Sequence, residues 1–186
     1  LNNKDFLFKS LFYKYLTKIS LRFSDLYTVT SHCDYNFLTQ KFDTSKVRIV
    51  PNWVESSNKH FTKKGNKKIL MVGRLEVQKN YPMAIEFLKK IGSDYELDIF
   101  GSGSQFDYLK SKSLDEELNI NFLGNVSHDK LLDIFRKYDY FLTTSNYEGN
   151  PKTVLEALSN ECLVFARNIP NHSEIITDGE NGYLFR

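Results

Sequence analysis

From residue 69 onward, short apolar runs alternate with amphipathic segments, and this alternation constrains the fold more than any other feature. The runs recur at intervals of roughly 20–30 residues. They are Ile69–Val72, Leu97–Phe100, Ile120–Leu123, Tyr140–Leu142 and Leu163–Ala166. The segments between them have helical periodicity and are Pro82–Ile91, Gln105–Leu114, Asp129–Tyr138 and Pro151–Asn160. Apolar strands that alternate with helices indicate βαβ units, so residues 69–186 are predicted to form an α/β domain with a doubly wound parallel sheet.

Residues 1–68 follow a different pattern. An amphipathic helix is predicted over Lys4–Tyr27, followed by a short strand at 27–30, a second helix at 31–42 and a strand at 47–50. The polar, basic stretch 55–68 is interpreted as a linker. The first 68 residues carry 13 Lys/Arg and 5 Asp/Glu, whereas the remaining residues carry 12 and 18. This asymmetry suggests that the two parts have different tasks or different neighbours.

Composition excludes several classes of protein. Hydrophobic residues make up 41% of the chain, which is enough for a packed core and excludes a wholly disordered chain. Two cysteines cannot form a disulfide scaffold, and no apolar run is long enough to span a membrane. The net charge of +2 is too small to indicate nucleic-acid binding. The chain begins at Leu1 without a secretory signal, so we expect a piece of a longer, cytoplasmic protein.

The loop after the first apolar run carries two cations. The segment 73–80 reads GRLEVQKN and contains Arg74 and Lys79. At the carboxyl edge of a parallel sheet, these two side chains suit a diphosphate. The Arg guanidinium can donate two parallel hydrogen bonds to phosphate oxygens, and the Lys ammonium adds a compact positive charge. The segment lacks the GxxxxGK[ST] pattern of nucleotide-hydrolysing loops. On spacing alone, a solvated charged loop is an equally good interpretation.

A second candidate site lies in the segment 145–158, SNYEGNPKTVLEAL. Asn150 is predicted to cap a helix and Pro151 to occupy its first position, which would create an anion site at the helix N-terminus. Glu148 precedes the cap, and Glu156 lies about one and a half turns inside the helix. Lys152 and Glu156 share a polar stripe, so the pattern alone favours a solvated position for Glu156.

Other features carry weaker signals. Gly101-Ser-Gly103 is an incomplete dinucleotide fingerprint and is equally well explained by a tight turn. The four histidines have no metal-ligand spacing with one another or with cysteine. His172 is predicted to lie in a loop before a helix that begins near Ser173, where a surface or capping position is favoured. No metal site is therefore expected.

Together these motifs resemble the C-terminal, donor-binding domain of the family 4 retaining glycosyltransferases, which have the GT-B fold of two Rossmann-like domains. The strongest element is the pair Glu148 and Glu156, which seven residues separate, within 145–158. The segments 73–80, 99–103, 122–126 and 174–185 also match in order. Residues 24–54 are similar to the end of the family's N-terminal domain. The chain departs from the family at Glu161 and Leu163, where Gly and Pro are usual, which puts the local turn in doubt.

The resemblance implies roles for individual residues. Arg74 and Lys79 would stabilise the leaving diphosphate, Glu148 would bind sugar hydroxyls near the reacting carbon, and Glu156 would accept both ribose hydroxyls. Backbone and small residues would surround the nucleotide: Gly73, Gly101, Asn125, Val126, Gly149, Asn150, Pro151 and Val154. The donor would be a UDP-sugar or GDP-sugar, with no metal and no other cofactor.

The resemblance also implies a domain plan. Residues 1–54 would be the remnant of the acceptor domain, 55–68 the linker and 69–186 the nucleotide-sugar-binding domain. Sugar would be transferred with retention to a glycan or lipid-linked acceptor, in the manner of enzymes of bacterial envelope polysaccharides. Without the rest of the acceptor domain, this chain should bind the donor but transfer little sugar.

The basic stripe Lys14, Lys18 and Arg22 leaves two interpretations of the first helix. Packing against the missing part of the acceptor domain is favoured, and peripheral contact with the inner face of a membrane is the alternative. Two alternatives to a transferase also stay open. One is a non-catalytic nucleotide-sugar-binding module or a subunit completed by a partner chain. The other is a different GT-B enzyme such as an epimerase, which the pair Glu148 and Glu156 disfavours.

Overall fold

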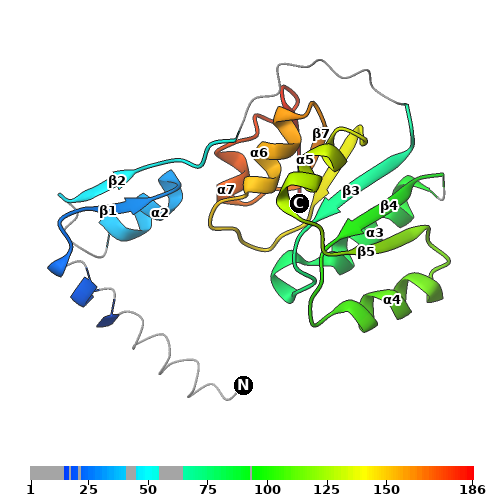
Figure 1. The fold of residues 1–186 in the computed structure, drawn as a ribbon, viewed down its shortest axis with the longest axis horizontal. Helices are drawn as coiled ribbons and strands as arrows, with labels where there is room; N and C mark the ends of the chain where they lie inside the picture. The colour runs from blue at the N-terminus through cyan, green and yellow to red at the C-terminus, as the bar shows by residue number, and fades with distance from the viewer. Residues whose placement is uncertain (1–14, 17, 21, 41–44, 55–64, 93) are drawn as a thin grey trace. The chain divides into compact units, whose positions relative to one another are not determined.

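The computed structural model describes residues 15–16, 18–20, 22–40, 45–54, 65–92 and 94–186. The chain divides into two compact units, Leu1–Pro51 and Asn52–Arg186. Figure 1 shows the strands and helices of each unit.

The smaller unit contains one β–α–β arrangement. Strands β1 (Tyr27–Val29) and β2 (Val47–Ile49) pair in parallel, and helix α2 (His32–Thr39) connects them. The helix begins at its predicted place because the Ser31 hydroxyl oxygen accepts a hydrogen bond of 3.0 Å from the Asp34 amide, which satisfies one free donor of the first turn. The predicted helix 4–27 lies partly outside the described residues. Those that are described are helical as far as Phe23.

The larger unit is built on one sheet of six parallel strands. Their order across the sheet is β5-β4-β3-β6-β7-β8, and every pair of neighbours runs parallel. The strands are β3 (Lys68–Val72), β4 (Glu96–Phe100), β5 (Ile120–Gly124), β6 (Tyr140–Thr143), β7 (Leu163–Arg167) and β8 (Gly182–Phe185). The predicted α/β class and parallel sheet are confirmed. The first and fourth strands of the sheet, β3 and β6, are neighbours, so the chain winds outward from this pair in both directions.

Helices cover both faces of the sheet, because its strands are apolar on both sides (Figure 1). Ile69 and Met71 pack with buried residues of α3 (Tyr81–Ile91) and α4 (Phe106–Asp115) on one face. Leu70, which points the other way, packs with buried residues of α5 (His128–Phe135) and α6 (Lys152–Ser159). Two core layers therefore hold the sheet in place.

The structure corrects several predicted boundaries. Helix α5 ends at Phe135, three residues before the predicted Tyr138. Helix α6 begins at Lys152, with Pro151 rather than Asn150 in the capping position. Helix α7 (Pro170–Ser173) begins three residues before the predicted start near Ser173, and strand β8 is an additional element that the apolar pattern did not predict.

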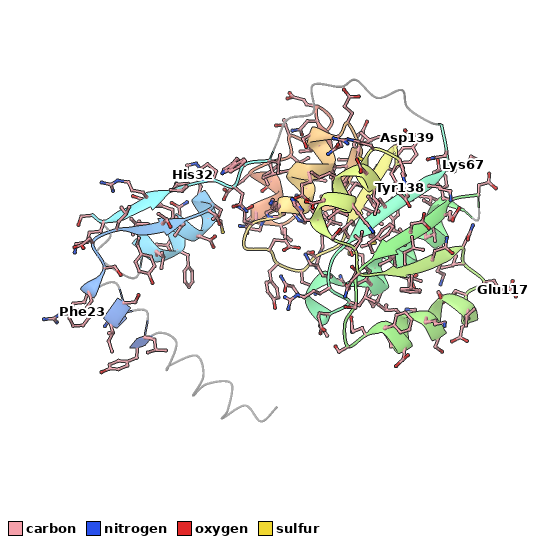
Figure 2. The ribbon with its side chains drawn as sticks, in the orientation of Figure 1. Phe23, His32, Lys67, Glu117, Tyr138 and Asp139 are labelled. Carbon is pink, nitrogen blue, oxygen red and sulfur yellow. The ribbon has the colours of Figure 1, made fainter. Side chains whose placement is uncertain are left out.

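One strand contains a buried carboxylate that an apolar pattern does not anticipate. Asp98, in the middle of β4, is only 4% exposed. It accepts hydrogen bonds from the Tyr138 hydroxyl at 2.6 Å and from the Asn121 amide at 2.8 Å. Tyr138 and Asp139 directly precede β6, as Lys67 precedes β3, and Figure 2 labels all three. Because Asp98 has two donors, its burial is satisfied within the fold.

Candidate nucleotide-sugar site

The loops that follow β3 and β6 are joined at the carboxyl edge of the sheet. The β3 loop contains the short 3₁₀ helix η1 (Val77–Lys79). The Asn146 amide donates to the Gln78 carbonyl at 2.8 Å, the Gln78 side chain donates to the Tyr147 carbonyl at 2.9 Å, and the Thr144 hydroxyl donates to the Lys79 carbonyl at 2.8 Å. The two loops therefore form one hydrogen-bonded assembly, in which the Arg74–Lys79 loop lies beside the Glu148 loop.

At the centre of this assembly lies an ion pair. Lys79 Nζ is 2.6 Å from Glu148 Oε1, and the two side chains are only 20% and 9% exposed. The Ser145 hydroxyl donates to the same carboxylate oxygen at 2.5 Å. Within the described part of the chain, no residue donates a hydrogen bond to the other oxygen, Oε2. Glu148 is therefore held by one oxygen and keeps the second available as an acceptor.

Helix α7 contacts the Glu148 loop. The Asn171 side chain donates to the Gly149 carbonyl at 2.8 Å. His172 is fully buried, its Nδ1 lies 2.7 Å from the Arg167 carbonyl, and burial lowers the pKa of its imidazole. A surface or capping position for His172 is therefore wrong. The Arg167 guanidinium donates a hydrogen bond to the side-chain oxygen of Asn146, which precedes Glu148 in the same loop.

The glycines of the site are required by close backbone approach. A Cβ on Gly101 would lie 1.9 Å from the Gly73 carbonyl oxygen, and a Cβ on Gly103 would lie 2.4 Å from the Leu75 carbonyl oxygen. Real contacts of that kind lie above about 3 Å. Only glycine therefore lets the loops after β3 and β4 pack against each other.

A small cavity opens next to these glycines. Its volume is about 150 Å³, and it is lined at the ends of β3, β4 and β5 by Gly73, Arg74, Gly101, Asn125 and Val126, among others. The structure thus places five of the residues that the sequence assigned to the donor around one cavity. Arg74 is exposed at this cavity, and no described carboxylate lies within ion-pair distance of its guanidinium. Its charge is available to a ligand.

Glu156 is buried, which makes its expected solvated position wrong. The residue is 2% exposed, and its Oε1 atom has no hydrogen-bond partner. Burial raises the pKa of this carboxyl group, whereas His128 and Lys152 lower it. His128 Nδ1 lies 3.7 Å away and Lys152 Nζ lies 3.8 Å away. A buried carboxylate that is not fully satisfied within the protein is a candidate for binding a ligand's donors.

The start of α6 presents less free backbone than the sequence suggested. The Lys152 amide donates to the Asn150 carbonyl and the Val154 amide to the Pro151 carbonyl, both at 2.9 Å. The Val154 side chain is fully buried in the core beneath the loop. Val154 therefore contributes packing at this position, while Gly149 remains exposed beside Glu148.

Some residues of the site were not identified from the sequence as functional. Ser145 lies inside a motif that was recognised, but the direction of its hydroxyl depends on the turn before Glu148. Asn171 reaches Gly149 across 22 positions of the chain, a contact that only the fold creates. His128 was dismissed because its sequence spacing suggested no metal, and its place beside Glu156 depends on the packing of α5 against α6.

Two properties of the described residues bear on the class of site. They contain no group of three or more His, Cys, Asp or Glu side chains that could hold a metal ion. No described helix is long and apolar enough to cross a membrane.

Comparisons with known proteins agree on one family. The family model described as "Glycosyl transferases group 1" matches residues 54–186. The poly(glycerol-phosphate) alpha-glucosyltransferase of Bacillus subtilis (strain 168) is 31% identical over 121 residues, which are 63% of this chain and 18% of that protein. The capsular polysaccharide biosynthesis glycosyltransferase CapH of Staphylococcus aureus is 29% identical over 157 residues, which are 79% of this chain and 43% of that protein.

A solved structure extends this likeness to the fold. The crystal structure of Anabaena HepE in complex with UDP-glucose superposes with a TM-score of 0.80 at 18% identity, over 90% of this chain and 51% of that one. The chain therefore spans about half, or less, of the length of the proteins to which it is similar.

Proposed function

Since the chain belongs to the group 1 glycosyl transferases, we propose that Asn52–Arg186 is the part of such an enzyme that binds a nucleoside diphosphate sugar. The fold is that of the GT-B glycosyltransferases, as the sequence resemblance indicated. The enzyme would transfer a hexosyl group, with retention, to a glycan or lipid-linked acceptor held by the N-terminal domain of a longer protein.

The observation that carries this proposal is the joined pair of loops at the carboxyl edge of β3 and β6. They bring two cations, Arg74 and Lys79, and one acceptor, Glu148 Oε2, to the same edge of the sheet. As the bond to the diphosphate breaks, negative charge grows on the phosphate oxygens. Fixed cations at that place stabilise the transition state more than the ground state.

Each side chain has a distinct task in this proposal. Arg74, whose guanidinium forms no ion pair with a described carboxylate, would bind the diphosphate through two parallel hydrogen bonds. Glu148 would accept a hydrogen bond from a sugar hydroxyl at Oε2, while Ser145 and Lys79 donate hydrogen bonds to Oε1. Lys79 would thereby serve two groups, since its ammonium can donate to a phosphate and to Glu148 at once. An inverting mechanism would need a catalytic base that takes the proton of the acceptor hydroxyl. Because retention is proposed, no residue of this chain is assigned that role.

The base would occupy the cavity beside Asn125 and Val126, and the ribose would reach the buried carboxylate of Glu156. A UDP-sugar or GDP-sugar is the proposed donor, and HepE in complex with UDP-glucose offers a precedent of the same fold. The protein cations would serve in place of a divalent ion. The name of CapH supports a proposed role in bacterial polysaccharide synthesis. We further propose that the enzyme acts on the cytoplasmic side of the membrane.

A thermal-shift screen of UDP-, GDP- and ADP-sugars tests the proposal. A ligand at a hundredfold excess over its Kd stabilises the folded state by about 2.7 kcal/mol. We expect one nucleotide class to raise the melting temperature, with and without a chelator, and the free nucleoside to raise it less. If none of the three classes raises the melting temperature of the wild-type chain, the proposal is wrong.

A further inference from the structure

The junction between β7 and α7 contacts the loop that carries Glu148 on both sides of that residue. Before Glu148, the Arg167 guanidinium donates a hydrogen bond to the Asn146 side chain. After Glu148, the Asn171 side-chain amide donates a hydrogen bond of 2.8 Å to the Gly149 carbonyl. Arg167 is the last residue of β7, and Asn171 lies in the first turn of α7. One junction therefore holds the backbone on each side of the carboxylate.

These two contacts differ in what else holds the loop. Asn146 makes two further hydrogen bonds, at 2.8 and 3.2 Å, to carbonyl groups of the loop after β3. Within the described residues, Gly149 makes no hydrogen bond other than that from Asn171. Gly149 is exposed, and no atom outside the adjoining residues lies within 4 Å of the position that a Cβ on it would take. Because a glycine backbone is also the least restricted, Asn171 is the residue that fixes the chain after Glu148.

The donor at this position is itself held in place. Asn171 is 8% exposed and His172 is fully buried. His172 Nδ1 lies 2.7 Å from the Arg167 carbonyl oxygen, which can only accept, so the ring donates there and links α7 to the end of β7. Strand β7 in turn pairs with β6 and β8. A buried, fixed amide loses little conformational entropy when it binds the loop, so its hydrogen bond stabilises one position of the loop.

The hydrogen bonds to the Glu148 carboxylate hold only one of its oxygens. Lys79 and Ser145 both donate to Oε1, so the position of Oε2 depends on the backbone that carries the side chain. We propose that Asn171 is a positioning residue for the donor's sugar: by holding the Gly149 carbonyl, it keeps Glu148 Oε2 where a sugar hydroxyl can donate to it. This inference rests on the proposed function, because it requires a nucleotide sugar whose sugar meets Glu148.

Calorimetry of four ligands separates the sugar from the nucleotide: UDP, UDP-glucose, GDP and GDP-mannose. Asn171→Ala should lower the affinity for the nucleotide sugar about 2- to 13-fold, the value of one hydrogen bond, and the affinity for the corresponding nucleotide by less than about twofold. Arg167→Ala should act in the same direction but more weakly, because Asn146 keeps its bonds to the loop after β3. This second variant tests the junction even where Asn171→Ala fails to fold.

A double-mutant cycle with Glu148→Gln shows whether Asn171 acts through Glu148. In the Glu148→Gln background, Asn171→Ala should change the affinity for the nucleotide sugar by less than about twofold, because the carboxylate that Asn171 positions is already absent. Ser173→Ala is the matched control, since Ser173 is exposed on the same helix and its hydroxyl donates to the Pro170 carbonyl rather than to the loop. The control should leave every affinity unchanged.

Two results would overturn the inference and leave the proposed function standing. One is an equal loss of affinity for nucleotide and nucleotide sugar in Asn171→Ala, or no loss for either. The other is the same loss from Asn171→Ala in the Glu148→Gln background as in the wild-type chain. If the wild-type chain binds none of the four ligands, the inference and the proposed function both fail.

Discussion

Replacing Lys79 by Ala separates two roles that the structure gives to one ammonium group. Lys79 pairs with Glu148 at 2.6 Å, with side chains 20% and 9% exposed. Breaking a buried pair costs about 3–5 kcal/mol, whereas surface pairs contribute about 0–1. These exposures lie nearer the buried case, so Lys79→Ala should lower the free energy of unfolding by about 2–4 kcal/mol.

The same substitution should weaken UDP binding for a separate reason. A hydrogen bond to a charged group contributes about 1.5–3 kcal/mol, which corresponds to about 10- to 150-fold in Kd. The double variant Lys79→Ala/Glu148→Gln removes the uncompensated carboxylate, so urea denaturation should show at least half of the lost stability recovered. Calorimetry with UDP should show no recovery of affinity, because the cation that meets the phosphates is still absent. Recovery of UDP affinity in the double variant would refute a direct role of Lys79 at the diphosphate.

Three further predictions concern other parts of the larger unit. Gly101→Ala should lower the free energy of unfolding by at least about 3 kcal/mol in urea denaturation, because its Cβ would lie 1.9 Å from a backbone carbonyl oxygen that cannot rotate away, whereas Gly149→Ala, with no atom within 4 Å of its Cβ, should change it by less than about 0.5 kcal/mol. Cys162 is 4% exposed, and burial raises the pKa of its thiol to about 12, so a thiol reagent at pH 8 should modify it only after unfolding, as mass spectrometry of labelled peptides would show. Burial raises the pKa of Glu156, so this carboxylate takes up a proton at a higher pH than a solvated one. The UDP affinity of the wild-type chain, measured by calorimetry from pH 8 to 5, should therefore fall as Glu156 is protonated. Glu156→Gln should bind UDP more weakly at pH 8 and should lack this fall.

The parallel sheet could be predicted because its determinants are local and repetitive. Apolar runs of strand length, such as Ile69–Val72, are separated by helices of ordinary length, and one parallel arrangement buries both faces of each strand. The same reasoning did not predict strand β8. Its sequence Gly182–Phe185 begins with glycine and has one exposed aromatic residue, Tyr183, as is common for a strand at the edge of a sheet.

The site could be located from the sequence, but the state of its side chains could not. The pattern around Glu148 and Glu156 marks the loop and helix, yet helical periodicity placed Glu156 on a solvated stripe. It is buried because α5 packs against α6, which brings His128 of α5 within 3.7 Å of its carboxylate. His172 was misplaced for a similar reason, since only the path of β7 brings the Arg167 carbonyl to its ring. Burial of single polar residues depends on contacts between distant elements, which periodicity does not contain.

The central claim is that the carboxyl edge of the sheet holds a nucleoside diphosphate. Amide NMR spectra of the ¹⁵N-labelled chain, titrated with UDP-glucose and with GDP-mannose, test it most directly because they report where the ligand lies. One of the two should shift amides of residues 73–80, 101–104, 124–128 and 145–156, while those at the amino edge of the sheet around Lys67 and Tyr138 stay unchanged. Shifts confined to other parts of the chain, or none with either donor at millimolar concentration, would contradict the account.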